Sequence, residues 1–168
     1  MKIDIRAGGP GDVTAVLDFW RKAAEGTDRH DDREKVVALI ERDPGALLIA
    51  ELAGESRDTA PETARETARE TARETARETA REMVGTVIAG WDGWRAHLYR
   101  LAVAEEHRRK GVGRALIAAA EERFRGFGAF RVDAMVLTDN LLAHHAWSAA
   151  GYAPQPEWAR WIKPMPQP

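Results

Sequence analysis

The sequence predicts an α/β fold of the α+β kind, in which short strands and amphipathic helices share one chain. Two apolar runs, residues 46–52 and 83–91, have the length of strands, and the second is rich in Val, Thr and Ile. Residues 98–103 can form another buried strand, and after a turn at 108–113 the apolar period becomes that of a helix. The side chains with this helical spacing are Leu116, Ala120, Phe124 and Phe127.

The amino-terminal part is expected to form one strand and two helices. Residues 2–6 alternate Ile with polar residues, as in a short strand, and the glycines and proline of 8–11 break it. Asp12 can cap a first helix, and a second is predicted over Asp32 to Arg42, ended by Pro44 and Gly45. The expected inward faces are Val13, Val16, Leu17, Trp20 and Ala24 in the first helix and Val36, Leu39 and Ile40 in the second.

A low-complexity insert, at about residues 54–82, separates the two apolar runs, which could pair as a hairpin. It contains five successive Thr-Ala-Arg-Glu units, from Thr63 to Glu82. Four residues overshoot one helical turn, so a helix here would have no fixed apolar face, and we expect a frayed, solvated helix or disorder. The insertion should cost little, because closure entropy rises by only ~0.6 kcal/mol per doubling of loop length. A partner-binding arm that makes the chain an assembly protein is the alternative.

The carboxyl-terminal half continues the alternation of strands and helices. An Asp-Gly turn at 91–94 leads into the strand expected over 96–104. After the central helix, Phe130 to Leu137 is predicted to be a fifth strand, and Asn140 to Ala150 a helix with Gly151 at its end. Tyr152 to Ile162 should carry a last strand, interrupted by two prolines.

Size and composition favour one domain over residues 1–168. The formal charge of −2 predicts no general attraction to nucleic acid or to a membrane. The chain has no Cys, which excludes disulfides, thiolate zinc sites and a cysteine nucleophile. The charged amino end is unlike a signal peptide, and no apolar run approaches the ~20 residues of a membrane span, so a cytoplasmic protein is expected.

The turn before the central helix has the features of an anion site. A helix start presents N–H groups without helical partners, and Gly111 and Gly113 allow a ligand to approach that backbone. Four cations surround the turn, although the helix dipole there favours acidic side chains, and bound phosphates would resolve the conflict. These cations are Arg108, Arg109, Lys110 and Arg114. A basic turn that only faces solvent is the alternative.

The spacing Arg108-x-x-Gly111-x-Gly113 resembles the acyl-CoA pyrophosphate loop, Gln/Arg-x-x-Gly-x-Gly/Ala, of the GNAT superfamily of N-acetyltransferases. A second stretch resembles the family pattern Asn-x-x-Ala-x-x-x-Tyr-x-x-x-Gly-Phe, and its matching residues are Asn140, Ala143, Trp147, Gly151 and Tyr152. The predicted order, β-α-α-β-β-β-α-β-α-β, also resembles the GNAT acyl-CoA N-acyltransferase fold outside residues 54–82. That resemblance implies a central mixed, mostly antiparallel sheet flanked by helices.

The resemblance implies direct transfer of an acetyl group from acetyl-CoA to an amine, in a ternary complex, without a metal. The fourth and fifth strands would separate to admit the pantetheine arm, and backbone groups of Leu101 and Val103 would bind its amides and polarise the thioester carbonyl. The residues implied to bind acetyl-CoA are Leu101, Ala102, Val103, Arg108, Arg109, Lys110, Gly111, Val112, Gly113, Arg114, Asn140 and Trp147. Dimers are common in the family, so a homodimer is left open.

The acceptor is expected to be a primary amine, whose pKa of ~10.4 leaves it mostly protonated at neutral pH. His97 stands six residues before Val103, where some histone-acetylating relatives carry a Glu, and is a candidate general base. A half-exposed strand residue with no role is the alternative, and Asp133 and Tyr99 are further candidates.

Trp147 replaces the Tyr thought to protonate the leaving thiolate, and an indole is not a usable acid. Tyr152, water or no dedicated acid could serve instead. Because this Tyr is absent, a second function stays open, in which the protein binds acyl-CoA as a sensor and catalyses no transfer. His144 and His145 point ~100° apart on a helix, so they cannot chelate one ion, and no metal is expected. The sequence does not identify the amine.

Overall fold

The computed structural model describes residues 2–23, 31–53 and 81–165. These residues belong to two compact units, Met1–Met135 and Val136–Pro168, each of which is described by itself. The predicted helix or disorder of the repeat insert lies outside the described residues, except that Arg81 and Glu82 already belong to a strand. None of the described helices is long and apolar enough to cross a membrane.

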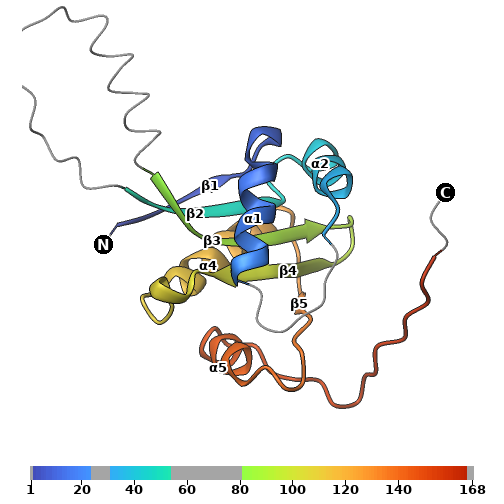
Figure 1. Ribbon diagram of the computed structural model, residues 1–168. Coiled ribbons are helices and arrows are strands. Elements are labelled where there is room, and N and C mark those ends of the chain that lie inside the picture. Colours follow the sequence, from blue (N-terminus) through green and yellow to red (C-terminus); the bar gives the residue numbers. More distant parts are fainter. Residues whose placement is uncertain (1, 24–30, 54–80, 166–168) are drawn as a thin grey trace, which may run out of the picture. The chain divides into compact units, whose positions relative to one another are not determined.

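The first unit is built on a five-stranded sheet in the order β1-β2-β3-β4-β5 (Figure 1). The strands are β1 (Ile3–Ala7), β2 (Leu47–Ala53), β3 (Arg81–Trp91), β4 (Ala96–Val103) and β5 (Val132–Ala134). The first four pair antiparallel, and β5 runs parallel to β4. The predicted mixed, mostly antiparallel sheet is therefore confirmed, including the hairpin of β2 and β3.

Helices cover both faces of this sheet (Figure 1). On one face lie α1 (Val13–Ala23) and α2 (Arg33–Arg42), and α4 (Val112–Gly126) packs on the other. Glycine at position 85 permits the second contact, because a Cβ there would lie 2.8 Å from Cγ1 of Val112. The apolar positions predicted for the first two helices form much of the core: Val13, Val16, Trp20, Val36 and Ile40 are buried, whereas Leu17 and Leu39 are half-buried. Ala24 lies outside the described residues.

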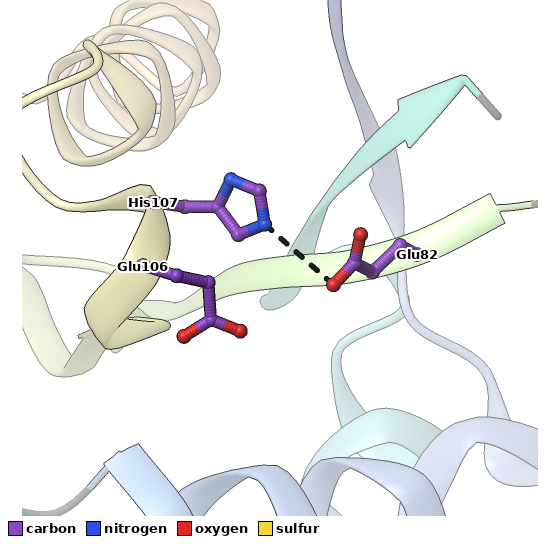
Figure 2. Close-up of side chains that lie close together, drawn as sticks. All are labelled: Glu82, Glu106 and His107. Atoms are coloured by element: carbon purple, nitrogen blue, oxygen red, sulfur yellow. Dashed lines mark ion pairs between the residues drawn. The ribbon is translucent and has the colours of Figure 1, made fainter. Parts of the chain in front are cut away.

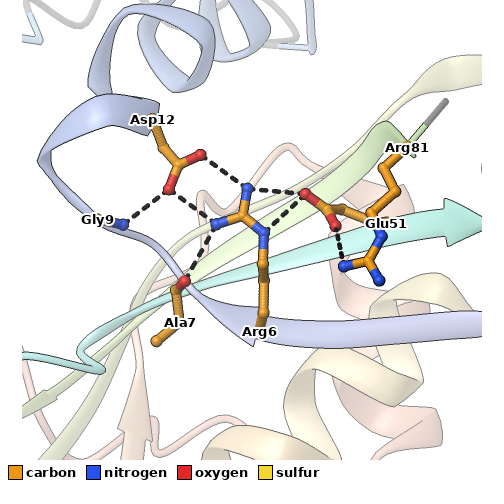
Figure 3. A network of polar contacts seen from close by, with 6 residues as sticks. All are labelled: Arg6, Ala7, Gly9, Asp12, Glu51 and Arg81. Carbon is orange, nitrogen blue, oxygen red and sulfur yellow. Dashed lines mark hydrogen bonds and ion pairs between the residues drawn. The ribbon is translucent and has the colours of Figure 1, made fainter. Parts of the chain in front are cut away.

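The prediction that Asp12 caps α1 is wrong, because Asp12 ends a 3₁₀ helix, η1 (Pro10–Asp12), that precedes α1. Its carboxylate accepts hydrogen bonds from the Gly9 N–H and from both terminal nitrogens of Arg6 (Figure 3). The Arg6 guanidinium and the Gly9 N–H hold the pKa of Asp12 below its usual value, against the opposing effect of burial. Arg6 also donates to the buried carboxylate of Glu51, at 2.7 Å, so this network ties η1 to β1 and β2.

The second unit contains one helix, α5 (Leu141–Ala149), among its described residues. Here the sequence prediction is partly wrong. Residues 152–162 form no strand in the described chain, since Pro154 and Pro156 lack the N–H groups that a strand donates to its neighbour. The predicted fifth strand is also shorter than expected, because only Val132–Ala134 pair with β4.

Candidate functional site

The predicted phosphate-binding turn lies at the start of α4. After β4 the chain forms a short 3₁₀ helix, η2 (Glu105–His107), and then a turn in which Arg109 and Gly111 have left-handed backbones, with φ of 57° and 88°. Gly111 is the N-cap residue, and its carbonyl accepts the Ala115 N–H at 3.0 Å. Within the described chain, the N–H groups of residues 112–114 have no protein acceptor. These three donors are available to a ligand.

The basic side chains of this turn are placed as an anion site requires. Arg109, Lys110 and Arg114 are exposed, and in the described residues their charged groups form no hydrogen bond or ion pair. Arg108 is half-buried, and its Nε donates to the carbonyl of Val103 at 3.4 Å. A Cβ at Gly111 would meet nothing within 4 Å, so the backbone is open to solvent there. Both the helix dipole and the unpaired cations favour a bound anion.

Beside this turn, β4 extends beyond its neighbour β5. The paired residues end at Leu98 and Ala134, whereas β4 continues to Val103. The Ala104 N–H donates to the carbonyl of Val84 on β3. Because successive strand residues present their N–H and C=O groups to opposite sides, those of Val103 point away from β3, toward the side where β5 has ended. An extended ligand can find backbone partners there.

His97 lies on β4 between two carboxylates. Its register partner on β5 is Asp133, whose Oδ2 is 3.9 Å from His97 Nδ1, and Oδ2 of Asp92 is 3.7 Å from Nε2. The side chain is 27% exposed, and the ring of Tyr99 lies 5.9 Å away between centroids. Arg131 forms an ion pair with Asp133 at 2.9 Å. The site thus combines an imidazole, two carboxyl groups and a phenol.

Sequence reasoning named His97, Tyr99 and Asp133 but treated Asp92 only as part of a turn. In the structure Oδ1 of Asp92 accepts the N–H groups of Trp94 and Arg95, and these bonds, first that of Arg95, lower the pKa of Asp92. The turn therefore holds a carboxylate beside the start of β4. The Asp-Gly dipeptide was a signal for the turn, but not for the direction in which the carboxylate points.

The remaining predicted residues belong to the second unit. Asn140 caps α5, because its Oδ1 accepts the Ala143 N–H at 2.9 Å. Trp147 is buried, and its ring meets that of Tyr152 edge to face, with 5.0 Å between centroids. Three of the residues that matched the second motif, Asn140, Trp147 and Tyr152, thus have local structural contacts.

One group of described residues has the composition of a metal site, although the sequence predicted none. Glu82 on β3 and Glu106 and His107 in η2 bring three ligand atoms within 4.8 Å of one another (Figure 2). His107 Nε2 lies 3.6 Å from Oε1 of Glu82, while its buried Nδ1 has no hydrogen-bond partner among the residues that the structure describes. Both carboxylates are exposed, and an ion pair with His107 accounts for the position of Glu82.

Comparison with known proteins gives matches over most of the chain. Residues 17–152 match the model of the Acetyltransferase (GNAT) family. The protein named Acetyltransferase SG1711, from Sodalis glossinidius (strain morsitans), is 31% identical over 138 residues, which cover 82% of this chain and 78% of that protein.

Two solved structures have a similar fold. Ard1 from Thermoplasma volcanium superposes with a TM-score of 0.65 at 21% identity, covering 91% of this chain and 84% of its own. The structure of yncA, a putative acetyltransferase from Salmonella typhimurium with its cofactor acetyl-CoA, has a TM-score of 0.59 at 18% identity and covers 90% and 79% of the two chains. At such identities the likeness concerns the fold.

Proposed function

The chain belongs to the Acetyltransferase (GNAT) family, and from this premise we propose that it transfers the acetyl group of acetyl-CoA directly to a primary amine in a ternary complex. The observation that carries the proposal is the start of α4, where three unpaired N–H groups and three unpaired cations of the described chain lie beside the end of β4. We also propose that residues 1–168 act as one acetyltransferase domain that carries the repeat insert, in the cytoplasm.

The turn before α4 would hold the pyrophosphate of CoA. The N–H groups of residues 112–114 would donate to its oxygens, while Arg109, Lys110 and Arg114 would neutralise its charge. Both glycines of the motif fit this role, since Gly111 has the required left-handed backbone and Gly113 has only Val103 near its Cβ position, at 3.7 Å. That the yncA structure contains acetyl-CoA is consistent with this assignment.

The end of β4 would hold the pantetheine arm and the thioester. Val103 directs its backbone groups to the side where β5 has ended, and the family resemblance implies the same role for the backbone of Leu101. Such donors would bind the amides of the arm and stabilise the negative charge that develops on the thioester oxygen during attack. Acetyl-CoA supplies the acyl carbon and the thiolate leaving group.

His97 would accept the proton of the amine. An amine with a pKa of ~10.4 must lose a proton before it can attack, and imidazole accepts protons near neutral pH. The neutral amine then attacks, the new C–N bond forms as the C–S bond breaks, the nitrogen releases its second proton to water, and the thiolate leaves. A thiol pKa of ~8.5 makes this thiolate a tolerable leaving group, so water can protonate it without a dedicated acid. Tyr152 stays the acid that the sequence suggests.

Thiol release in the presence of acetyl-CoA and a panel of primary amines tests the proposal. We expect release that depends on the amine, and a loss of about 10²–10⁴-fold in kcat for His97→Gln, which is the usual contribution of a general base. The loss should be greatest near neutral pH, with CoA affinity unchanged. The matched control is His145→Gln, at an exposed histidine of α5.

A sensor that only binds acyl-CoA is the second candidate, suggested by Trp147 at the tyrosine position. It would bind CoA in calorimetry yet release no thiol above background with any amine. That result would refute the enzymatic proposal, whereas an unchanged pH–rate profile in His97→Gln would remove only the assignment of the base.

A further inference from the structure

Arg100, on β4, has a backbone conformation that is rare for an arginine. Its φ is +51°, in the left-handed region, which costs roughly 1–2 kcal/mol for a residue with a Cβ. It lies in a β-bulge: β4 has two residues between Tyr99 and Ala102, whereas β3 has only Val87 between their partners Ile88 and Thr86. A strained conformation persists only where the surroundings stabilise it, and such residues concentrate at functional sites.

Three neighbours hold Arg100 in place, and we call the four residues together the Arg100 clamp: Arg100, Asp31, Trp20 and Thr86. The guanidinium forms an ion pair with Asp31, just before α2, and lies 5.4 Å above the indole of Trp20 on α1. Both charged side chains are largely buried, at 15% and 22% exposure, so the pair is shielded from solvent screening.

The clamp also fixes the Arg100 backbone. Trp20 Nε1 donates to Oγ1 of Thr86 at 2.8 Å, and the Thr86 hydroxyl donates to the carbonyl of Arg100 at 3.5 Å. Thr86 is fully buried, so its hydroxyl has no access to water as an alternative partner. The side chain and the carbonyl of Arg100 are therefore tied to the same tryptophan.

The contacts of the Arg100 carbonyl determine the orientation of the peptide group between Arg100 and Leu101. A trans peptide is planar, so the C=O of Arg100 and the N–H of Leu101 point in opposite directions. Because the Arg100 carbonyl and the Leu101 N–H belong to one rigid peptide group, the contacts that fix the carbonyl also fix the direction of the Leu101 N–H, on the part of β4 that extends beyond β5. This is the backbone donor that the proposed function assigns to the thioester carbonyl.

We propose that Arg100 is a positioning residue: the Arg100 clamp aims the Leu101 N–H at the thioester oxygen. The inference rests on the proposed function. It adds that α1 and the start of α2 determine the geometry of a donor on β4, through Trp20 and Asp31. Residues that contact neither the cofactor nor the amine would then control the rate of acetyl transfer.

Two variants test the clamp from its two ends. Arg100→Gly adopts a positive φ without strain but loses the guanidinium, and Thr86→Val removes the hydroxyl with almost no change in volume. Each should lower kcat by about 10–100-fold, as expected when a catalytic donor is displaced by a fraction of an ångström to 1 Å, while the KM for acetyl-CoA changes little. Arg100→Lys keeps the charge opposite Asp31 and should recover part of the loss.

A spectroscopic measurement separates positioning from a purely structural role. Acetyl-CoA labelled with ¹³C at the thioester carbonyl should show a carbonyl stretch at lower wavenumber in the wild-type complex than in water. The stretch should return toward the free value in Arg100→Gly and Thr86→Val. The control is Thr14→Val, which removes the exposed α1 hydroxyl that accepts a hydrogen bond from Arg33 and should leave stretch and kcat unchanged.

The outcomes distinguish this inference from the proposed function. Folded Thr86→Val protein that binds acetyl-CoA with the wild-type carbonyl stretch and turnover would overturn the inference alone. Wild-type protein that binds acetyl-CoA and shifts its carbonyl stretch, yet acetylates no amine, would contradict the proposed function, and loss of that shift in Thr86→Val would still support the clamp. A lower melting temperature with an unchanged stretch would assign the clamp to stability only.

Discussion

Alanine at Gly111 and at Gly113 should have opposite effects on stability, although the two residues are neighbours in one motif. Gly111 has a φ of +88° and precedes α4, whereas Gly113 is a helical residue of its first turn. A Cβ would meet nothing within 4 Å at Gly111 and would make an ordinary contact with Val103 at Gly113. The two changes therefore differ in backbone conformation and not in steric clash.

The size of each change in stability follows from the backbone conformation at the two positions. A left-handed alanine costs about 1–2 kcal/mol, of which the lower entropy of the unfolded chain recovers about 0.4–1 kcal/mol, so Gly111→Ala should destabilise by roughly 1 kcal/mol. Replacing a helical glycine with alanine gains about 0.5–1 kcal/mol, so Gly113→Ala should stabilise. At about 2–4 °C per kcal/mol for a chain of this size, the two melting temperatures should differ by about 3–8 °C.

Thermal unfolding and calorimetric titration with CoA measure both effects. Gly111→Ala should also bind CoA more weakly, because relief of the strain would turn the N–H groups at the start of α4. Gly113→Ala should keep most of its affinity, in agreement with the Gly/Ala alternatives of the motif it resembles. Equal melting temperatures, or full CoA affinity in Gly111→Ala, would show that the left-handed turn is not what shapes this site.

Two further predictions concern packing and pH. Gly85→Ala would place a Cβ 2.8 Å from Val112 and 2.9 Å from Leu116, so α4 must shift. Urea unfolding should show a loss of stability of about 1–3 kcal/mol, and CoA should bind more weakly. The control is Gly126→Ala, where a Cβ would meet open space and should lower neither stability nor CoA affinity. The lowered pKa of Asp12 stabilises the fold above the unfolded value near 3.8, and this contribution is lost as pH falls through the lower folded value. Asp12→Asn should therefore be less stable than wild type at pH 7, by about 1–3 kcal/mol, and the gap in unfolding free energy should narrow in acid; a constant gap would refute the role of the charge.

Features that depend on residues close in sequence could be predicted, and the turn before α4 is the example. Its glycines and cations lie within seven residues, so the sequence alone predicted the helix start that the structure contains, whereas phosphate binding there stays a prediction. The Asp-Gly turn at 91–94 was local in the same way. In contrast, Arg100 and Asp31 are far apart in sequence, and nothing near either residue indicates the bulge that brings them together.

The prediction of a last strand over Tyr152 to Ile162 is wrong for a related reason. Its apolar residues, Trp158, Trp161 and Ile162, have strand-like composition, yet they are 76%, 94% and 74% exposed. A strand is stable only with a neighbour that pairs with its backbone, and composition does not report whether one exists. Asp12 shows the same limit: it has the residue type of a helix cap, but the salt bridge with Arg6 determines where its carboxylate points.

Backbone strain links the two halves of the proposed site. Among the described residues, the non-glycine residues with positive φ are Arg100 and Arg109, one at the proposed carbonyl donor and one in the phosphate turn. The strain at Arg100 is offset by the Arg100 clamp. Arg109 is exposed and its guanidinium makes no polar contact within the described chain, so its side chain does not offset the cost of about 1–2 kcal/mol. A phosphate bound by the guanidinium would offset it, which is the physical reason to assign Arg109 to ligand binding and Arg100 to the geometry of β4.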